Sequence, residues 1–294
     1  MQPSIAQSAG SAFDENRPRL WRVAYRMLGS RADADDVVQD AYLRWHDAAR
    51  EDIRSPQAWL MTTTTRLAID RLRQRRAERE SYTGPWLPEP LVEAAAPSAD
   101  QCAEIASDLS VAFLAVMERL APEERAAFLL HEVFDSSYED IARILDKSEA
   151  ASRQIVSRAT KRVRADRPRV KVNAAVTRRL LNQLASAVQS NDQNAMLEIL
   201  ATDSKWISDG GGKARAARKV IRGAVKLARF GTGVFRKYRS ELTFLPILVN
   251  EEPGLAAVFR EHLVSIIAIR TDGEKIVDVF SILNPDKLRE VRIG

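Results

Sequence analysis

The sequence is poor in cysteine and has no long hydrophobic run. Cys102 is the single cysteine among 294 residues, which excludes an intramolecular disulfide and a cysteine-rich zinc site. No run reaches the ~18–20 apolar residues of a membrane span, and residues 1–19 lack the apolar segment of a secretory signal. Glycine and proline, at 12 each, are too rare for a collagenous or low-complexity chain. We therefore expect a cytoplasmic protein with no membrane, metal or cofactor partner.

Charge is unevenly distributed along the chain. Residues 33–52 carry seven acidic side chains and two basic ones, whereas residues 66–79 carry six arginines and two acidic side chains. The alternation recurs, with ten acidic and four basic residues in 108–150 and eight basic and one acidic in 152–171. A solvated amphipathic helix explains one such block. Two blocks indicate two helical units, each with an acidic half followed by a basic half.

Hydrophobic periodicity predicts three helices in the first 80 residues. The first buries a stripe that runs from Leu20 to Leu28 and ends at Gly29. The second opens at Asp33, and the third follows Ser55-Pro56 and continues into an arginine-rich end. The third helix contains four consecutive threonines at 62–65, which have poor helix propensity. Tertiary contacts or a bound partner must therefore stabilise that stretch.

The composition changes after this helix, and residues 81–107 are predicted to be an interdomain linker. Four prolines between positions 85 and 97 break any helix there. Trp86, Leu87 and Leu91 are apolar residues that are unfavourable in full contact with water. We expect this linker to dock on a neighbouring domain.

Residues 137–164 have the spacing of a helix-turn-helix. A short amphipathic helix over 137–145 is followed by a turn at Asp146-Lys147, and Ser148 caps a longer helix. The predicted inward stripe is Ser152, Val156, Ala159 and Val163. The predicted outward set is Glu149, Arg153, Gln154, Ser157, Arg158 and Lys161. Arginine pairs with guanine or phosphate and glutamine with adenine, so the outward set could read DNA. A helical hairpin with a basic exposed face is the alternative.

The last third of the chain predicts an α+β domain. Two helices over 173–189 and 193–200 precede five strand-like runs between 204 and 283. Residues 271–274 form a hairpin turn between the last two runs. We expect one curved sheet of meandering antiparallel strands with helices on its concave side, enclosing a pocket.

The first 165 residues resemble an extracytoplasmic-function (ECF) sigma-70-type factor with regions 2 and 4 only. The resemblance lies in ADADDVVQDAYLRW, SPQAWLMTTTTRLAIDRLRQRR and LAPEERAAFLLHEVFDSSYEDIARILDKSEAASRQIVSRA. It implies binding to core RNA polymerase, through the β′ clamp and the β subunit, and to promoter DNA. Region 2 would read the minus-ten element and region 4 the minus-thirty-five element.

The resemblance also implies roles for residues of region 2. The polymerase-binding set would be Asp33, Asp35, Asp36, Gln39, Asp40 and Arg44. The set contacting single-stranded bases and phosphates would be Thr62, Thr63, Arg66, Arg71, Arg73, Arg75 and Arg76. Many members of the family carry Asn where this chain has Arg66.

The C-terminal part resembles a SnoaL-like cone domain, which is fused to the sigma core in one group of these factors (group 41). Three segments carry this resemblance. They are Trp86, Leu87, Pro88, Glu89, Pro90 and Leu91; Asp209, Gly210, Gly211, Gly212 and Lys213; and Asn284, Pro285, Asp286, Lys287 and Leu288. The resemblance implies a built-in regulator in place of a membrane-bound anti-sigma protein. The docked linker would set the distance between regions 2 and 4.

The sequence therefore predicts a multi-domain sigma factor that is not an enzyme. Its parts would be region 2, an all-α bundle (1–80); the linker (81–107); region 4, an all-α domain with the helix-turn-helix (108–168); and the α+β SnoaL-like regulatory domain (169–294).

Other interpretations of the C-terminal part remain open. The domain could bind an unidentified small ligand as a sensor, or be an isomerase-type enzyme that uses Asp209, His262 and Tyr238. Residues 213–239 hold ten basic residues and no acidic one. That segment could bind nucleic acid, hold the acidic linker and region 2, or simply be solvated.

Overall fold

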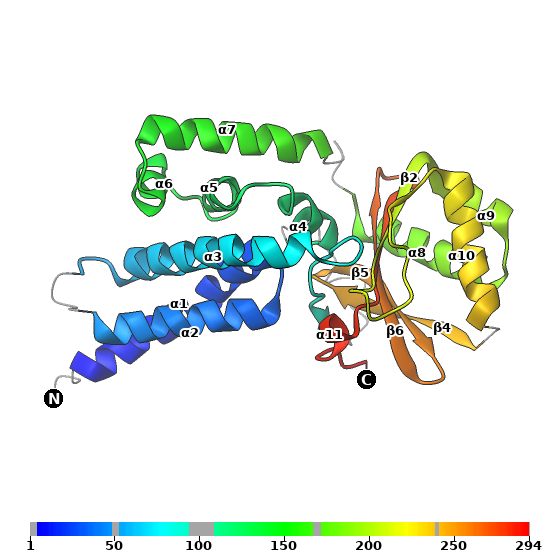
Figure 1. Ribbon diagram of the computed structural model, residues 1–294, viewed down its shortest axis with the longest axis horizontal. Coiled ribbons are helices and arrows are strands. Elements are labelled where there is room, and N and C mark those ends of the chain that lie inside the picture. The colour runs from blue at the N-terminus through cyan, green and yellow to red at the C-terminus, as the bar shows by residue number, and fades with distance from the viewer. Residues whose placement is uncertain (1–4, 49–52, 94–108, 167–171, 239–240, 294) are drawn as a thin grey trace. The chain divides into compact units, whose positions relative to one another are not determined.

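The computed structural model describes residues 5–48, 53–93, 109–166, 172–238 and 241–293 (Figure 1). The chain folds into two compact units. The helical unit consists of residues 1–80 and 116–166, and the sheet unit consists of residues 81–115 and 167–294. The sheet unit thus contains the expected linker and the first residues of the segment expected to be region 4.

The helical unit consists of two groups of three helices in its described part. The first group is α1 (Ile5–Leu28), α2 (Arg31–Asp47) and α3 (Pro56–Glu80); the second is α5 (Pro122–Glu132), α6 (Tyr138–Leu145) and α7 (Glu149–Asp166). Helix α2 begins after Ser30, whose hydroxyl accepts a hydrogen bond from the backbone N–H of Asp33. Helix α3 contains Thr64 and Thr65, which are fully buried, so tertiary packing stabilises the threonine run. The three predicted N-terminal helices are confirmed.

The helix-turn-helix is formed by α6 and α7. Ser137 caps α6, and Asp146 ends it in the left-handed conformation with φ 54° and ψ 53°, a conformation that aspartate tolerates better than most residues. The hydroxyl of Ser148 accepts a hydrogen bond from the backbone N–H of Ala151 at 3.2 Å and caps α7. The four residues of the predicted inward stripe are buried and the six of the predicted outward set are exposed. The predicted periodicity of this helix is confirmed.

The sheet unit is built on one sheet whose described residues form seven strands in the order β1-β4-β5-β6-β7-β2-β3. The strands are β1 (Val92–Glu93), β2 (Leu200–Asp209), β3 (Ile221–Arg222), β4 (Leu242–Val249), β5 (Glu252–Phe259), β6 (His262–Thr271) and β7 (Ile276–Ile282). The helices are α4 (Val111–Met117), which begins in this unit, α8 (Ala174–Gln189), α9 (Gln193–Ile199), α10 (Ala224–Tyr238) and α11 (Pro285–Leu288).

Strand order differs from the expected meander at one place. Strands β4 to β7 are antiparallel neighbours, but β2 pairs with β7 in parallel, with Asp209 opposite Ile282. The two partners are far apart in sequence, and a strand's own pattern does not identify a distant partner. The parallel pairing brings the carboxyl ends of β2 and β7 to the same edge of the sheet, which positions the site described below.

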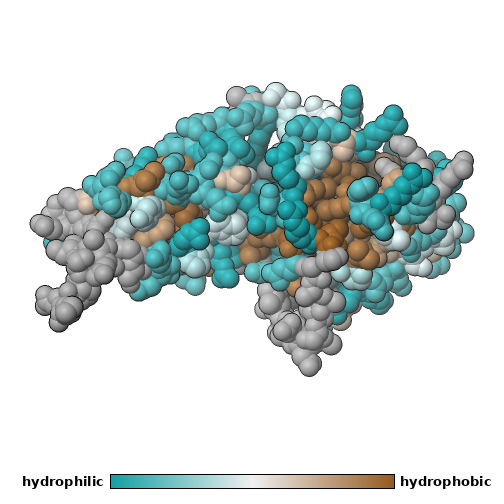
Figure 2. Space-filling view, turned by 90° about the horizontal axis from the view of Figure 1, so that it is seen from below, coloured by the Kyte–Doolittle hydropathy of each residue, from teal (hydrophilic) through white to brown (hydrophobic). Residues whose placement is uncertain are grey.

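The sheet unit contains a cavity of about 530 Å³ between helices α8 and α10 and the sheet. Figure 2 shows apolar side chains gathered in a hollow on this unit and bordered by hydrophilic ones. The expected pocket is therefore present.

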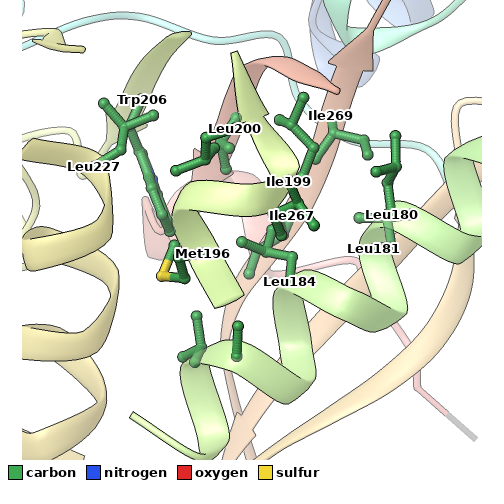
Figure 3. Packing of buried hydrophobic residues seen from close by; sticks show 14 of the residues in the cluster. Leu180, Leu181, Leu184, Met196, Ile199, Leu200, Trp206, Leu227, Ile267 and Ile269 are labelled. Carbon is green, nitrogen blue, oxygen red and sulfur yellow. The ribbon is translucent and has the colours of Figure 1, made fainter. Parts of the chain in front are cut away.

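The sheet is buried on both faces. On one face, residues from α8, α9, α10, β2 and β6 pack together, including Leu184, Met196, Trp206, Leu227 and Ile267 (Figure 3). On the other face a second cluster includes side chains of β4 to β7 together with Leu87 and Val111. Alternate residues of each strand point to opposite faces, so the linker and the start of α4 cover the face that the helices leave open.

Candidate functional site

The carboxylate of Asp209, at the end of β2, is the centre of a buried polar cluster. Asp209 is 0% exposed. Its Oδ1 accepts hydrogen bonds from the Tyr82 hydroxyl at 2.5 Å and the Gly211 backbone N–H at 3.1 Å. Its Oδ2 accepts from the Leu87 backbone N–H at 2.8 Å and from Lys287 Nζ at 2.6 Å. A buried carboxylate needs such partners, and here two of the four belong to the linker.

Lys287 completes the attachment of the linker. Its ammonium donates to the Leu87 carbonyl oxygen at 2.5 Å and lies 4.0 Å from the ring centroid of Trp86, a cation–π distance. Asn284 Nδ2 donates to the Tyr82 hydroxyl at 2.8 Å. The three segments singled out in the sequence thus meet at one place, although they are more than 70 residues apart.

Backbone geometry ties the end of β2 to the segment after β7 and explains the glycine at position 211. The Asp209 carbonyl oxygen accepts from the backbone N–H groups of Leu283 and Asn284 at 2.7 and 2.9 Å, which ties the end of β2 to the segment after β7. Gly211 has φ 59°, and a Cβ built there would lie 2.3 Å from Asn284 Nδ2. Only glycine fits this left-handed position against Asn284.

The rest of the described linker continues along the sheet. Leu87 is 1% exposed in the second core cluster, and burying one leucine contributes ~1.5–3 kcal/mol. The Leu91 carbonyl accepts from the Asn250 N–H at 2.7 Å, and its N–H donates to Asn250 Oδ1 at 3.1 Å. Val92 then pairs with Val249 at the sheet edge. The described part of the linker, residues 81–93, is therefore an integral part of the sheet unit.

Tyr82 gives this docking a pH dependence. Burial, and after it the hydrogen bond to Asp209 and the carboxylate's charge, raise the Tyr82 pKa above its usual value. The stabilisation from Tyr82 is therefore complete below pH ~10, where a solvated tyrosine ionises, and is lost as pH rises through the raised pKa.

We expect Tyr82→Phe to leave the tyrosinate absorbance gained between pH 10 and 11 unchanged. A variant amplitude smaller by one tyrosine would contradict this.

In the helix-turn-helix, the expected DNA-reading side chains lie on the exposed face of α7. Arg153 pairs with Glu149 at 2.5 Å, and its guanidinium carbon lies 4.7 Å from the ring centroid of Tyr138. Exposed pairs of this kind contribute little, so Arg153 can exchange Glu149 for a base or a phosphate at small cost.

In region 2, the expected polymerase contact Asp33 is not on the surface. Asp33 is 1% exposed, and its carboxylate pairs with Arg71 at 3.0 Å and with Arg75. The expectation that Asp33 contacts a partner protein is therefore wrong for this structure, because the acid neutralises two arginines of α3. Arg71 and Arg75 are correspondingly paired with α2, and each keeps about a third of its side chain exposed.

The other two arginines at the end of α3 have exposed partners. Arg73 pairs with Asp70 at 3.1 Å and with Glu123 of α5 at 2.7 Å. Arg76 pairs with Glu80 at 3.2 Å. Such surface pairs are readily replaced by a phosphate contact.

The edge expected to hold minus-ten bases is covered by the second group of helices. Arg66 donates through Nε to the Ile144 carbonyl at 2.9 Å and through Nη2 to the Arg143 carbonyl at 2.8 Å. It thereby caps the C-terminal end of α6, where a cation is favoured by the helix dipole. Thr62 lines a hollow of about 230 Å³ whose other wall includes Ile144. Thr63 is half-buried.

The remaining acidic face of α2 is accessible. Asp36, Gln39, Asp40 and Arg44 are exposed; of these, Asp36 has a long pair with Arg71 at 3.5 Å. Asp35 is exposed too and accepts from Trp21 Nε1 at 2.8 Å. Leu43 is 52% exposed beside them. Leu43 was not predicted from the sequence. An apolar residue on an otherwise polar helix face is the feature that indicates such a contact residue.

A buried arginine joins the two helix groups and was also missed. Arg125 of α5 is 3% exposed and donates to the Met27 carbonyl at 2.6 Å and to Glu118 at 2.8 Å. Arg79 of α3 pairs with the same Glu118. Burial lowers the Arg125 pKa to about 9; burial, and then the nearby cations Arg125 and Arg75, lower that of Arg79 to about 9.

Two of the three residues proposed for an enzymatic site, Asp209 and His262, have described side chains. Asp209 is bound to the linker, His262 is exposed at the start of β6, and the side chain of Tyr238 lies outside the described residues. Among the described residues, no three His, Cys, Asp or Glu side chains are grouped to hold a metal ion. In the same part of the chain, no helix combines the length and hydropathy needed to cross a bilayer.

In the basic segment, Lys213 pairs with Asp286 at 2.5 Å. The side chain of Lys237, and Arg239 altogether, lie outside the described residues.

Comparisons with known proteins agree with this arrangement. Residues 12–78 match Sigma-70 region 2 and residues 110–163 match Sigma-70 region 4. The chain is 37% identical to the ECF RNA polymerase sigma factor SigJ of Mycobacterium tuberculosis over 288 residues, covering 94% of this chain and 92% of SigJ. It is 28% identical over 289 residues to the probable ECF sigma factor SigI of the same species, covering 96% and 95%.

SigJ also has a solved structure. The crystal structure of M. tuberculosis SigJ aligns with a TM-score of 0.76 and 34% sequence identity over 97% of this chain and 99% of SigJ. Two sigma-70 regions on helical bundles define a sigma-70-type transcription initiation factor. The chain belongs to the extracytoplasmic-function RNA polymerase sigma factors. A SnoaL-like C-terminal domain is consistent with the SigJ fold.

Proposed function

We propose that this sigma factor is controlled by its own sheet unit, which holds the linker between regions 2 and 4. The observation that carries the proposal is the convergence of the linker, the Asp209 segment and the Lys287 segment on one buried carboxylate. A linker fixed in this way limits how far region 4 can move from region 2. Both promoter elements can be bound together only if that distance fits them.

Region 4 reads the minus-thirty-five element through the exposed face of α7, and region 2 reads the minus-ten element through α3. The exposed face of α2 binds the β′ clamp, and region 4 also contacts the β subunit. The exposed position of Arg153 and Gln154 near the start of a helix-turn-helix recognition helix supports the first assignment. The exposed Leu43 among polar side chains supports the third. The sigma factor acts in the cytoplasm.

We expect base readout by Arg153 and Gln154 to be position-specific. Alanine at either residue should cost ~1–3 kcal/mol at one promoter position and relax base preference there. Lys161→Ala, on the same exposed face, is the matched control and should weaken binding about equally for all sequences. The measurement is binding to a library with a randomised minus-thirty-five element. Uniform loss for Arg153→Ala would reduce its role to a phosphate contact.

Transcription with core RNA polymerase on a randomised promoter library tests the whole proposal. We expect the full chain to select start sites, and a chain that ends at Arg169 to select them with altered strength or spacing preference. Identical selection by both forms would remove the regulatory role of the sheet unit.

The factor acts by binding, without chemistry of its own. The use of Asp209 by the linker supports this over an isomerase-type function, because a carboxylate with four donors is not available as a base.

A further inference from the structure

The cavity of the sheet unit has the size and lining of a small-molecule site. Its volume of about 530 Å³ falls within the ~300–1,000 Å³ typical of ligand pockets. Leu184, Trp206, Phe230, Phe244 and Leu255 contribute apolar walls. Phe230 and Phe244 keep part of their surface exposed, so an apolar occupant would gain by covering them.

The polar groups of the cavity are few and carry one sign of charge. Ser208, Ser265 and Ser281 lie in the wall, and Ser281 accepts from Trp206 Nε1 at 2.8 Å. Among the described residues that line the cavity, the charged ones are Arg215 and Arg289. Both are exposed, and within the described part of the chain Arg289 pairs with Asp286 at a long distance of 3.7 Å. The buried wall of the cavity is uncharged in its described part, and the two exposed arginines give the rest of the lining a positive charge.

We propose that this cavity binds a small anionic amphiphile, an apolar body with one carboxylate or similar acid group. The apolar body lies against Phe230, Phe244 and Leu255, and the acid group pairs with Arg215 or Arg289. A cation is disfavoured, because the lining offers it two like charges and no carboxylate among the described residues.

The cavity wall and the linker attachment are made by the same short segments. Ser208 precedes Asp209, Leu283 and Pro285 flank Asn284, and Leu288 follows Lys287. Neighbouring residues of these segments therefore line the cavity and hold the linker. An occupant that moves the wall moves the groups that hold Tyr82 and Leu87. This coupling rests on the proposed function of the linker, whereas the binding site itself does not.

Binding of three probes to the full chain tests the site, namely decanoate, decan-1-ol and decylammonium, below their aggregation limits. We expect decanoate to bind about tenfold more tightly than the alcohol and decylammonium most weakly. The double variant Arg215→Gln/Arg289→Gln should bring decanoate to the level of the alcohol. Ala257→Phe, which fills the cavity, should abolish binding of both.

The surface double variant keeps the test decisive if Ala257→Phe does not fold. Equal affinity for the three probes, or a preference for decanoate that survives the double variant, would overturn the proposal.

Hydrogen exchange at the Leu87 amide, with and without decanoate, tests the coupling. We expect the exchange rate to change at least about threefold on binding. Unchanged exchange with bound decanoate would overturn the coupling while leaving the site. Docking of the linker is tested separately, without any ligand, by the Asp209 variant described below.

Discussion

Asp209→Asn is expected to destabilise the sheet unit by about 3–5 kcal/mol. The substitution keeps the shape of the side chain but removes the charge, so Lys287, whose side chain is 12% exposed, stays buried without its counter-ion. The amide also cannot accept at both oxygen positions, so either the Tyr82 hydroxyl or the Leu87 N–H loses its partner. The linker is held by these groups and should detach before the rest of the unit unfolds.

Urea unfolding followed by tryptophan fluorescence measures this effect, since Trp86 and Trp206 both lie in the sheet unit. The matched control is Asp203→Asn, an exposed residue of the same strand, which should change stability by no more than ~0.5 kcal/mol. Lys287→Met should be costly as well, and the double variant should lose less than the two single variants together. Additive losses, or an Asp209→Asn variant as stable as the control, would show that the cluster does not hold the linker.

Arg125→Met is expected to separate region 4 from region 2 in the free protein. The variant removes the donors to the Met27 carbonyl and to Glu118, and it leaves a buried carbonyl without that partner. Breaking a buried charged contact in this way costs ~3–5 kcal/mol. Arg66 and Arg73 also link the two groups of helices, but both are exposed residues, so we expect their contacts not to compensate.

The distance between two spin labels tests this prediction. Labels at Gln57 and Ser157, both exposed, would be introduced with Cys102 replaced by Ser. The wild-type chain should give one narrow distance distribution and Arg125→Met a broad and longer one. Arg164→Met, a 73% exposed residue of α7, serves as the control and should match the wild type. A narrow distribution in Arg125→Met would mean that the surface pairs hold the regions together.

Local signals in the sequence predicted the elements well. The cap at Ser148 was predicted because a short hydroxyl side chain satisfies a free N–H group, and the stripe of α7 follows from its 3.6-residue period. The structure adds caps at Ser30 and Ser137. The strands β4 to β7 follow from runs of Val, Ile and Phe. Two-residue strands such as β1 and β3 are too short to leave a pattern.

Local signals could not predict which residues far apart in the sequence contact one another. The acidic segment with Asp33 and the basic segment with Arg71 and Arg75 resemble two surfaces for two partners, yet they neutralise each other across 38 residues. The composition of a segment gives its charge but does not show which other segment packs against it. Asp209 and Lys287 were identified through the resemblance to a family. Tyr82, which donates to Asp209, was missed, and Arg125 has no local pattern that distinguishes it from a surface arginine.

Open-complex formation with core RNA polymerase and Trp86→Ala is the most direct test of linker control. The variant loses the cation–π contact with Lys287 but changes no group of regions 2 or 4. The account predicts unchanged affinity for the polymerase and a change of at least about threefold in the rate of promoter opening. An opening rate equal to that of the wild type, at equal polymerase affinity, would contradict it.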